Sequence, residues 1–279
     1  MLLSLIANFP FLECNIGINL MTVKTKITEN IAEVTLSRPE VHNAFNDEMI
    51  KELTKAFLEL STNKNIRVII LAGEGKSFCA GGDLNWMKKA IDYTYEENIE
   101  DSLKLAKMFR TINECPKPVI ARIQGTAIGG GVGLVSVCDV SCTVSTAKFS
   151  LSEVKIGLIP AVISPFVMKK IFPGEARRYF LTGERFDANE AKRIGLISEV
   201  ASDEEEMDKK INEWTEAMLS GGPEAISTCK KMIRDVAFLN TDEALELSSK
   251  ELAERRASKE GQEGIKAFFE KRKPNWINE

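Results

Sequence analysis

Two short apolar runs, each followed by a glycine-rich loop, constrain this chain more than any other feature. The runs are "VIILA" (68–72) and "KPVIARI" (117–123), and their lack of alternation is typical of strands buried on both faces. The loop "GEGKSFCAGGD" (73–83) follows the first run, and three glycines (129–131) follow the second. A helical pattern comes next in both places. We therefore expect a repeated unit of strands, glycine loop and helix, although the sequence shows no strict period.

Periodicity and capping signals predict the other elements. Residues 22–36 alternate as a β-hairpin does, and 46–62 form an amphipathic helix with Asn46 as its N-cap. The remaining expected elements are helices at 94–113, 164–172 and 187–194, strands at 140–144 and 148–151, and a long helix that begins in the acidic run 203–206. Charge-rich helices replace strands near residue 200. We expect a core at 21–200 and a helical region at 201–279, to which the resemblance described below assigns oligomerisation.

Residues 1–20 differ from the rest of the chain because they are apolar and contain no Lys or Arg. A secretory signal would have a positively charged n-region and a small-residue cleavage site, and residues 1–20 show neither clearly. Asn8, Pro10 and Glu13 interrupt the run too often for a membrane span. We expect Met21 to be the natural start and residues 1–20 to be a leader or loose tail.

Composition argues against several kinds of site. A net charge of −4 speaks against a nucleic-acid-binding face, which is usually basic. The six cysteines include no C-x-x-C pair and His42 is the only histidine, so we expect no metal site. Free, buried thiols fit a reducing cytoplasm. Because no G-x-S-x-G nucleophile motif occurs either, acid–base chemistry should rest on carboxylates.

The glycine loops do not match nucleotide-binding patterns. A Walker A motif ending at Gly75-Lys76-Ser77 fails because Ile70 stands where its first glycine belongs, and the dinucleotide pattern fails at Leu134. Glycine lets a ligand approach the backbone, and amides at a helix N-terminus point outward. Two such amides could form an oxyanion hole, in which one donor is worth about 3–4 kcal/mol. Tight turns or close helix–strand packing explain the glycines equally well.

The candidate acid–base residue is Glu153 in "FSLSEVKIGLIP" (149–160). It stands at a strand end among apolar residues, where desolvation would raise the pKa of its carboxyl group and suit it for proton transfer. A helix-capping acid would produce the same pattern, so both interpretations stay open.

The motifs together resemble the crotonase (enoyl-CoA hydratase/isomerase) superfamily over residues 22–278. The segments that carry the resemblance are "RPEVHNAF" from Arg38, "SFCAGGD" from Ser77, "IQGTAIGGG" from Ile123, Cys138-Asp139, "EVKIGLIP" from Glu153, "LTGERFDANEAKRIGLISEV" from Leu181 and "FFEKRKPNW" from Phe268.

The resemblance implies an α/β, ClpP/crotonase-like spiral of ββα units followed by a helical C-terminal region. It implies homotrimers, often paired into hexamers, in which the C-terminal segment helps to cover a CoA site. The substrate would be an acyl-CoA thioester, with no metal or other cofactor and no nucleic-acid or membrane partner. The oxyanion-hole amides would be those of Gly82 and Gly130, with Glu153 as acid/base. The implied substrate-binding residues are Arg38, His42, Ala44, Phe78, Ala80, Asp83, Leu84, Gly129, Gly131 and Pro160.

One position departs from the pattern of well-studied hydratases in this superfamily. Those enzymes use two glutamates. By the resemblance, the first of them would stand at the position that Gly133 occupies in this sequence. A hydratase delivers both OH and H, whereas a Δ3,Δ2-enoyl-CoA isomerase needs one carboxylate to carry a proton. Taken alone, Gly133 therefore favours an isomerase.

A second segment points back to hydration. "SEVKIGLIPAVISPF" (152–166), followed by "RRYFLTGERFD" (177–187), resembles the bacterial methylglutaconyl-CoA or γ-carboxygeranoyl-CoA hydratases of leucine and terpenoid breakdown, where many ordinary hydratases have P-G-x-G-G-T-Q-R. The distal carboxylate of that substrate would need a cation, for which Lys155, Arg177 and Arg178 are candidates. The alternatives are an isomerase or short-chain hydratase using Glu153 alone, and a protein of this fold that binds acyl-CoA or RNA without turnover.

Overall fold

The computed structural model describes residues 18–19 and 22–277. Met21 and residues 1–17 and 20 of the predicted leader lie outside the described residues. The two described leader residues form β1 (Ile18–Asn19), which pairs antiparallel with β2 (Val23–Thr28). No helix in 22–277 is long and apolar enough to cross a bilayer.

A seven-stranded sheet forms the centre of the fold, in the order β1-β2-β3-β4-β6-β8-β11. The hairpin of β2 and β3 is antiparallel, and every pairing from β3 onward is parallel. The bounds of the later strands are β3 (Ile31–Leu36), β4 (Val68–Gly73), β6 (Val119–Ile123), β8 (Val140–Val144) and β11 (Glu199–Ala201). The predicted hairpin and both buried apolar strands are confirmed.

A second sheet places the glycine loops. Its order is β10-β9-β7-β5, and its strands are β5 (Ser77–Cys79), β7 (Thr126–Ile128), β9 (Lys148–Ser150) and β10 (Arg185–Asp187). The chain runs from β4 to β5, from β6 to β7 and from β8 to β9, so three strands of the large sheet are each followed by a strand of the small sheet. Helices then complete the units, which confirms the predicted spiral of ββα repeats.

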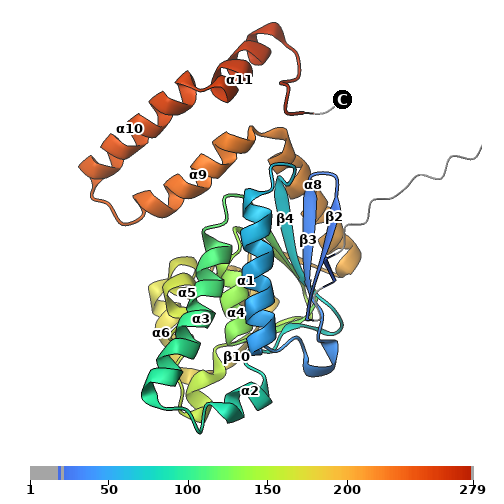
Figure 1. The fold of residues 1–279 in the computed structure, drawn as a ribbon, viewed down its shortest axis with the longest axis vertical. Coiled ribbons are helices and arrows are strands. Elements are labelled where there is room, and N and C mark those ends of the chain that lie inside the picture. Colours follow the sequence, from blue (N-terminus) through green and yellow to red (C-terminus); the bar gives the residue numbers. More distant parts are fainter. Residues whose placement is uncertain (1–17, 20–21, 278–279) are drawn as a thin grey trace, which may run out of the picture.

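Helices cover both faces of the large sheet (Figure 1). On one side lie α1 (Asp47–Thr62) and α3 (Tyr95–Asn113), whose N-caps are Asn46 and Thr94. On the other side α8 (Glu204–Ser220) packs against β4, β6, β8 and β11. The shorter helices are α2 (Leu84–Lys89), α4 (Gly130–Val137), α5 (Ser164–Lys170), α6 (Pro173–Thr182) and α7 (Ala188–Arg193), with 3-10 turns η1 (Pro39–Val41) and η2 (Ser152–Ile156).

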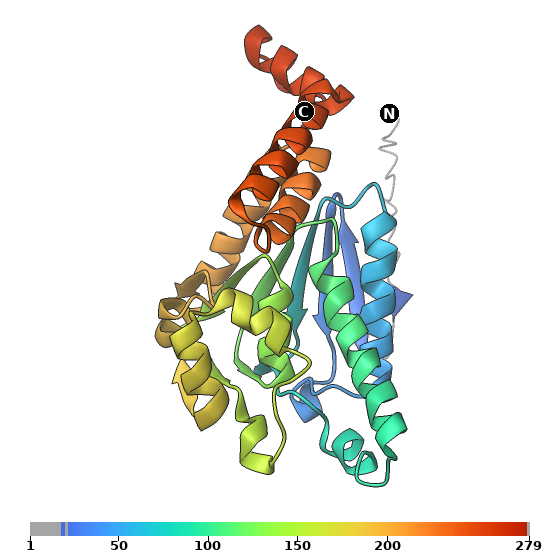
Figure 2. The same cartoon turned by 90° about the vertical axis from the view of Figure 1, so that its left-hand side faces the viewer.

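The last three helices form an arm that extends away from the sheets (Figures 1 and 2). They are α9 (Pro223–Val236), α10 (Thr241–Ala257) and α11 (Lys259–Glu270). The final strand ends at Ala201, close to the predicted change from strands to helices, although α8 still packs on the large sheet.

Two sequence-based expectations need correction. The expected helix 164–172 ends at Lys170, and a separate helix, α6, begins at Pro173, where proline supplies a fixed φ at the first helical position. The thiols are not all buried, because Cys229 on α9 is exposed while Cys79, Cys115, Cys138 and Cys142 are buried. Cys14 lies outside the described residues.

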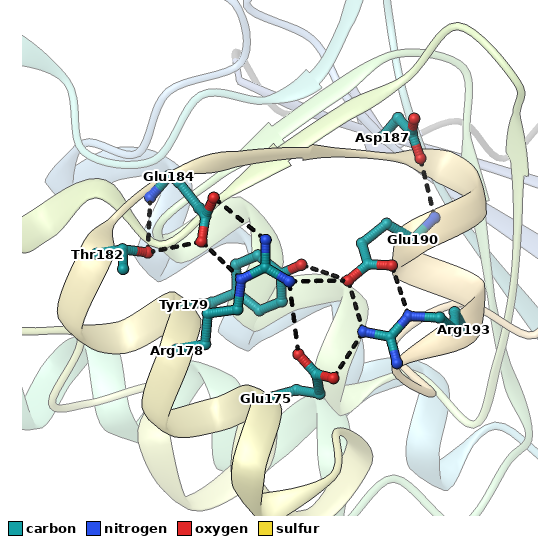
Figure 3. Close-up of polar contacts among 8 residues, drawn as sticks. All are labelled: Glu175, Arg178, Tyr179, Thr182, Glu184, Asp187, Glu190 and Arg193. Atoms are coloured by element: carbon teal, nitrogen blue, oxygen red, sulfur yellow. Dashed lines mark hydrogen bonds and ion pairs between the residues drawn. The ribbon is translucent and has the colours of Figure 1, made fainter.

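A network of ion pairs joins α6 to α7 (Figure 3). Arg193 contacts Glu175 and Glu190, each at 2.6 Å, and the Tyr179 hydroxyl donates to Glu190 Oε1. Arg178 contacts the same two acids at 4.0 and 3.6 Å. The hydrogen bonds from Arg193 and Tyr179 lower the pKa of the Glu190 carboxyl group to about 2. Charge on Glu190 therefore stabilises the junction of the two helices.

We expect Glu190→Gln to lower the free energy of unfolding by about 1 kcal/mol at neutral pH. Because the folded-state pKa is depressed, the carboxylate's contribution is full above the unfolded value of about 4.3 and is lost as pH falls toward 2. Urea unfolding of both proteins between pH 7 and 3 should show a difference that shrinks below about pH 4.3. Glu254→Gln, at an exposed position on α10, is the control; a pH-independent difference for Glu190→Gln would contradict this assignment.

Candidate active site

Glu153 is carried by the 3-10 turn η2, directly after strand β9. The turn ends at Gly157, whose φ of 77° is readily adopted by glycine, and Leu158 N–H donates to Glu153 O at 3.0 Å. Gly183, at the end of α6, packs against Val154 so closely that a Cβ there would lie 3.0 Å from the valine Cγ2. The helices joined by the ion-pair network thus support the segment that bears Glu153.

The Glu153 carboxylate lies against the bare backbone of Gly129. A Cβ at Gly129 would be 2.9 Å from Glu153 Oε1 and 3.3 Å from Cδ, and the φ of Gly129 is 52°. Glu153 Oε2 is buried and has no hydrogen-bond partner among the described residues. Burial raises the pKa of this carboxyl group, and a bond to its own backbone N–H opposes the shift. A desolvated carboxylate with one oxygen free of hydrogen bonds suits proton transfer better than helix capping.

The two glycine loops meet beside this carboxylate. Phe45 N–H donates to Gly81 O at 2.7 Å, and Asp83 N–H donates to Phe45 O at 2.8 Å, which makes a parallel bridge between Phe45 and Gly82. In such a bridge the N–H of Gly82 points away from Phe45. A Cβ on Gly81 would lie 3.6 Å from the nitrogen of Gly130, so the loops are in direct contact.

Gly82 and Gly130 therefore present free amides at one junction. Gly130 is the first residue of α4, where backbone N–H groups have no partner within the helix. Neither amide donates to an acceptor in the described part of the chain. The positive end of the α4 dipole reinforces this position. Two outward amides next to a desolvated carboxylate can hold a carbonyl oxygen while a proton moves nearby.

The segment from Arg38 to Ala44 is fixed to the first glycine loop. Arg38 pairs with Asp83 at 2.8 Å and donates to Ala44 O at 2.7 Å, and Asp83 also caps α2. His42 has a φ of 54°, and its Nδ1 lies 3.0 Å from Ser77 Oγ. Arg38 and Asp83 therefore neutralise one another and shape the loop.

The other predicted substrate-binding residues fall into different environments. Phe78 is fully buried in the core, as are its neighbours on β5. Leu84 is 81% exposed at the start of α2, whereas Pro160 is buried. Ala80 N–H donates to His42 O at 3.0 Å. Gly131 serves packing, because a Cβ there would lie 2.2 Å from Cys79 O.

Gly133, the position of the absent acid, faces a filled space. A Cβ at this position would lie 2.3 Å from Ile163 Cγ2 and 2.9 Å from the Phe109 ring. Ile163 and Phe109 are 3% and 0% exposed. Apolar side chains thus occupy the volume that an acid at position 133 would enter.

Sequence reasoning missed three contributors to the site: Phe45, Phe109 and Ile163. Their contacts join segments distant in the chain and leave no local signature. It also offered Arg178 as a cation for a distal carboxylate, but Arg178 is engaged with Glu184 at 2.8 Å and with two further acids. Within 22–277 no three His, Cys, Asp or Glu side chains are grouped as metal ligands.

Comparison with known proteins gives matches over most of the chain. The family model described as enoyl-CoA hydratase/isomerase matches residues 26–279. The enoyl-CoA hydratase ACTT6 of Alternaria alternata is 37% identical over 209 residues, 75% of this chain and 68% of that protein. A mitochondrial Delta(3,5)-Delta(2,4)-dienoyl-CoA isomerase of Dictyostelium discoideum is 32% identical over 253 residues, 88% of this chain and 86% of its own.

A solved structure matches equally well. The crystal structure of an enoyl-CoA hydratase from Shewanella pealeana superimposes with a TM-score of 0.89 at 37% identity, covering 92% of this chain and 97% of that one. The matched part includes the core and extends into the C-terminal helices, because the fraction of this chain left unmatched is shorter than the segment α9–α11.

Replacing Glu153 with glutamine should stabilise the protein. The raised pKa means that the folded state disfavours the charged carboxylate, so stability is lost as pH rises through the folded-state value. We expect Glu153→Gln to raise Tm at pH 7, and the gain to shrink as pH falls toward 4.3, about the unfolded value. Scanning calorimetry measures the rise in Tm and its pH dependence. Glu216→Gln, at an exposed position of α8, is the control. A lower Tm at pH 7 would show that the carboxylate is well paired.

Proposed function

Because the chain belongs to the enoyl-CoA hydratase/isomerase family, we propose that it hydrates a short enoyl-CoA of the 3-methylglutaconyl type, or dehydrates the corresponding hydroxyacyl-CoA. The protein is an enzyme of this family and acts on acyl-CoA thioesters. The observation that carries the proposal is the buried Glu153 carboxylate, with its unpartnered Oε2, beside the junction of two glycine loops.

The amides of Gly82 and Gly130 are the proposed donors to the thioester oxygen. As the β-carbon of the enoyl group gains a bond, negative charge moves onto that oxygen and gives an enolate. Both N–H groups are fixed before the reaction, Gly82 by the bridge to Phe45 and Gly130 as the first residue of α4. Their alignment therefore needs no reorganisation when the charge develops.

A single carboxylate can carry both proton transfers of hydration. Glu153 accepts a proton from water as the water oxygen bonds to the β-carbon and the double-bond electrons move toward the thioester. The protonated acid then returns that proton to the α-carbon, which restores the carbonyl and the carboxylate. The OH and the H of one water molecule are thereby added to the double bond, and no second acidic residue is needed. A raised pKa favours the first step, since the carboxylate must take the proton from water and hold it in between.

The methylglutaconyl assignment rests on the segment 152–166 and its resemblance to that group of hydratases. Its substrate has a distal carboxylate, which a cation should meet. With Arg178 engaged by acids, Lys155 and Arg177 are the remaining candidates, and Lys155 follows Glu153 by two residues on η2. Leucine or fatty-acid breakdown in the cytoplasm is the proposed setting.

A second candidate, a Δ3,Δ2-enoyl-CoA isomerase, is favoured by one observation. Ile163 and Phe109 fill the space facing Gly133, so the second carboxylate of a two-acid site has no room. An isomerase needs Glu153 only to remove a proton on one side of the double bond and return it on the other.

We also propose that the arm α9–α11 associates with a second copy of the chain, as a trimer or a pair of trimers. Its exposed apolar side chains include Phe268 and Phe269, which are 79% and 78% exposed. Apolar patches of this kind mark association surfaces. The arm, rather than all of residues 201–279, would be the oligomerisation region, since α8 packs on the large sheet.

Three substrates separate the candidate activities. Purified protein should consume 3-methylglutaconyl-CoA, with loss of its enoyl absorbance, and should act weakly on crotonyl-CoA. Conversion of only a 3-enoyl-CoA would favour the isomerase, and binding without turnover would favour a binding protein.

Glu153→Gln should lower kcat by at least about 100-fold, with little change in thioester binding by calorimetry. Because the active form is the ionised carboxylate, kcat/KM should fall as pH drops through a value above the usual 4.3 or so for glutamate. Glu216→Gln is the control, and full activity in Glu153→Gln would remove Glu153 from the mechanism.

Phe268→Asp should dissociate the assembly, as measured by light scattering during gel filtration, because it places a charge in the proposed apolar contact. Lys266→Asp introduces the same side chain at an exposed position of the same helix and should leave the assembly intact. A wild-type monomer, or an unchanged assembly in Phe268→Asp, would contradict the proposed interface.

A further inference from the structure

One face of the first turns of α4 has no side chains of its own. Gly133 N–H donates to Gly129 O at 3.1 Å, so the two glycines are stacked one helical turn apart. The Glu153 carboxylate lies over Gly129, while Ile163 and Phe109 lie over Gly133. Acyl carbons that extend past Glu153 along this bare face would meet the two apolar side chains one turn further on.

The residues at that point form a continuous wall. A Cβ on Gly130 would be 2.6 Å from the Phe45 ring, which contacts Phe109 edge-on with centroids 6.0 Å apart. The Phe109 ring in turn lies 6.2 Å from that of Phe166. Ile163 is held by its backbone, whose oxygen accepts from Phe166 N–H and Val167 N–H at 3.0 Å each. The wall therefore extends from Gly130 to the start of α5.

A groove begins beyond this wall. Its volume is about 410 Å³, and its lining includes Phe166, Val137 on the next turn of α4, Ile233 of α9, and Phe238, which follows the end of α9. Phe166 thus belongs both to the wall and to the groove. Ile163 has the side chain nearest to Gly133, so it is the residue whose size decides how far the bare face of α4 continues.

We propose that Ile163 is a specificity-determining residue that closes the acyl site one turn beyond Glu153 and limits the substrate to short acyl chains. The proposal deepens the proposed function and rests on it for the location of the thioester. It also makes Gly133 and Ile163 a matched pair, because a side chain fits at position 133 only if the one at 163 is small.

Chain-length preference tests the closure. Ile163→Ala should improve kcat/KM for decenoyl-CoA relative to crotonyl-CoA by about tenfold or more, since several methylenes gain apolar contacts. Ile194→Ala removes the same side chain from a buried site at the end of α7 and should leave the ratio unchanged. Ile163→Leu keeps the volume but removes the Cγ2 branch that faces Gly133, and it should move the ratio in the same direction if Ile163→Ala fails to fold. An unchanged ratio in a folded, active variant overturns the proposal.

Binding of saturated thioesters separates this proposal from the proposed function. Calorimetry with butyryl-CoA and decanoyl-CoA requires no turnover, and Ile163→Ala should tighten only the longer one. A wild-type protein that binds butyryl-CoA but converts no enoyl-CoA would refute the proposed function and leave the pocket standing. If the wild-type protein binds decanoyl-CoA more tightly than the Ile163→Ala variant does, closure of the acyl site by Ile163 is refuted and the proposed function is unaffected.

The matched pair is tested by stability. Gly133→Glu should lower Tm strongly, and Gly133→Glu with Ile163→Ala should recover part of that loss, a non-additivity expected of residues in contact. Gly133→Glu with Ile194→Ala should lose both contributions. Additive losses in the first pair would show that Ile163 does not occupy the volume facing Gly133.

Discussion

The contact between a carboxylate and a bare backbone is the constraint on which the site depends. Glu153 can lie against Gly129 only because that residue has no Cβ, which would come within 2.9 Å of the carboxylate oxygen. The φ of 52° at Gly129 adds a second reason for glycine. The same position directly follows β7 and precedes the first residue of α4, so a side chain there would disturb the acid and the start of the helix together.

The fold brings these parts together by repetition. Strands β4, β6 and β8 of the large sheet are each followed by a short strand of the small sheet, and the first two of these short strands lead into glycine loops. The parallel pairing of β5 with β7 places both loops at the same edge, where Gly81 and Gly130 are in contact. Close approach continues behind the site, since Gly131 packs on the backbone of Cys79. Packing and chemistry thus require glycine at neighbouring positions for different reasons.

Much of this was predictable from the sequence, because local patterns determine it. Apolar runs gave the buried strands, and Asn46 accepts from Met49 N–H at 2.9 Å as its capping signal indicated. Glu153 stood out as an acid among apolar residues, and its burial follows from that environment. The contacts of Phe45 with Gly82 and of Ile163 with Gly133 were not predictable from one sequence, because they join residues distant in the chain.

The apolar side chains that face Gly133 and the single acid, Glu153, together determine the electrostatics of the site. A second carboxylate near Glu153 would bring like charge and hydration into the site, and both change the proton affinity of the first acid. Ile163 and Phe109 fill that volume instead, and desolvation by burial is the main cause of the raised pKa of Glu153. In the proposed mechanism, a proton held by Glu153 has few acceptors other than the bound substrate, whose enolate the amides of Gly82 and Gly130 would stabilise. The absent acid at Gly133 is therefore compatible with proton transfer through Glu153 alone.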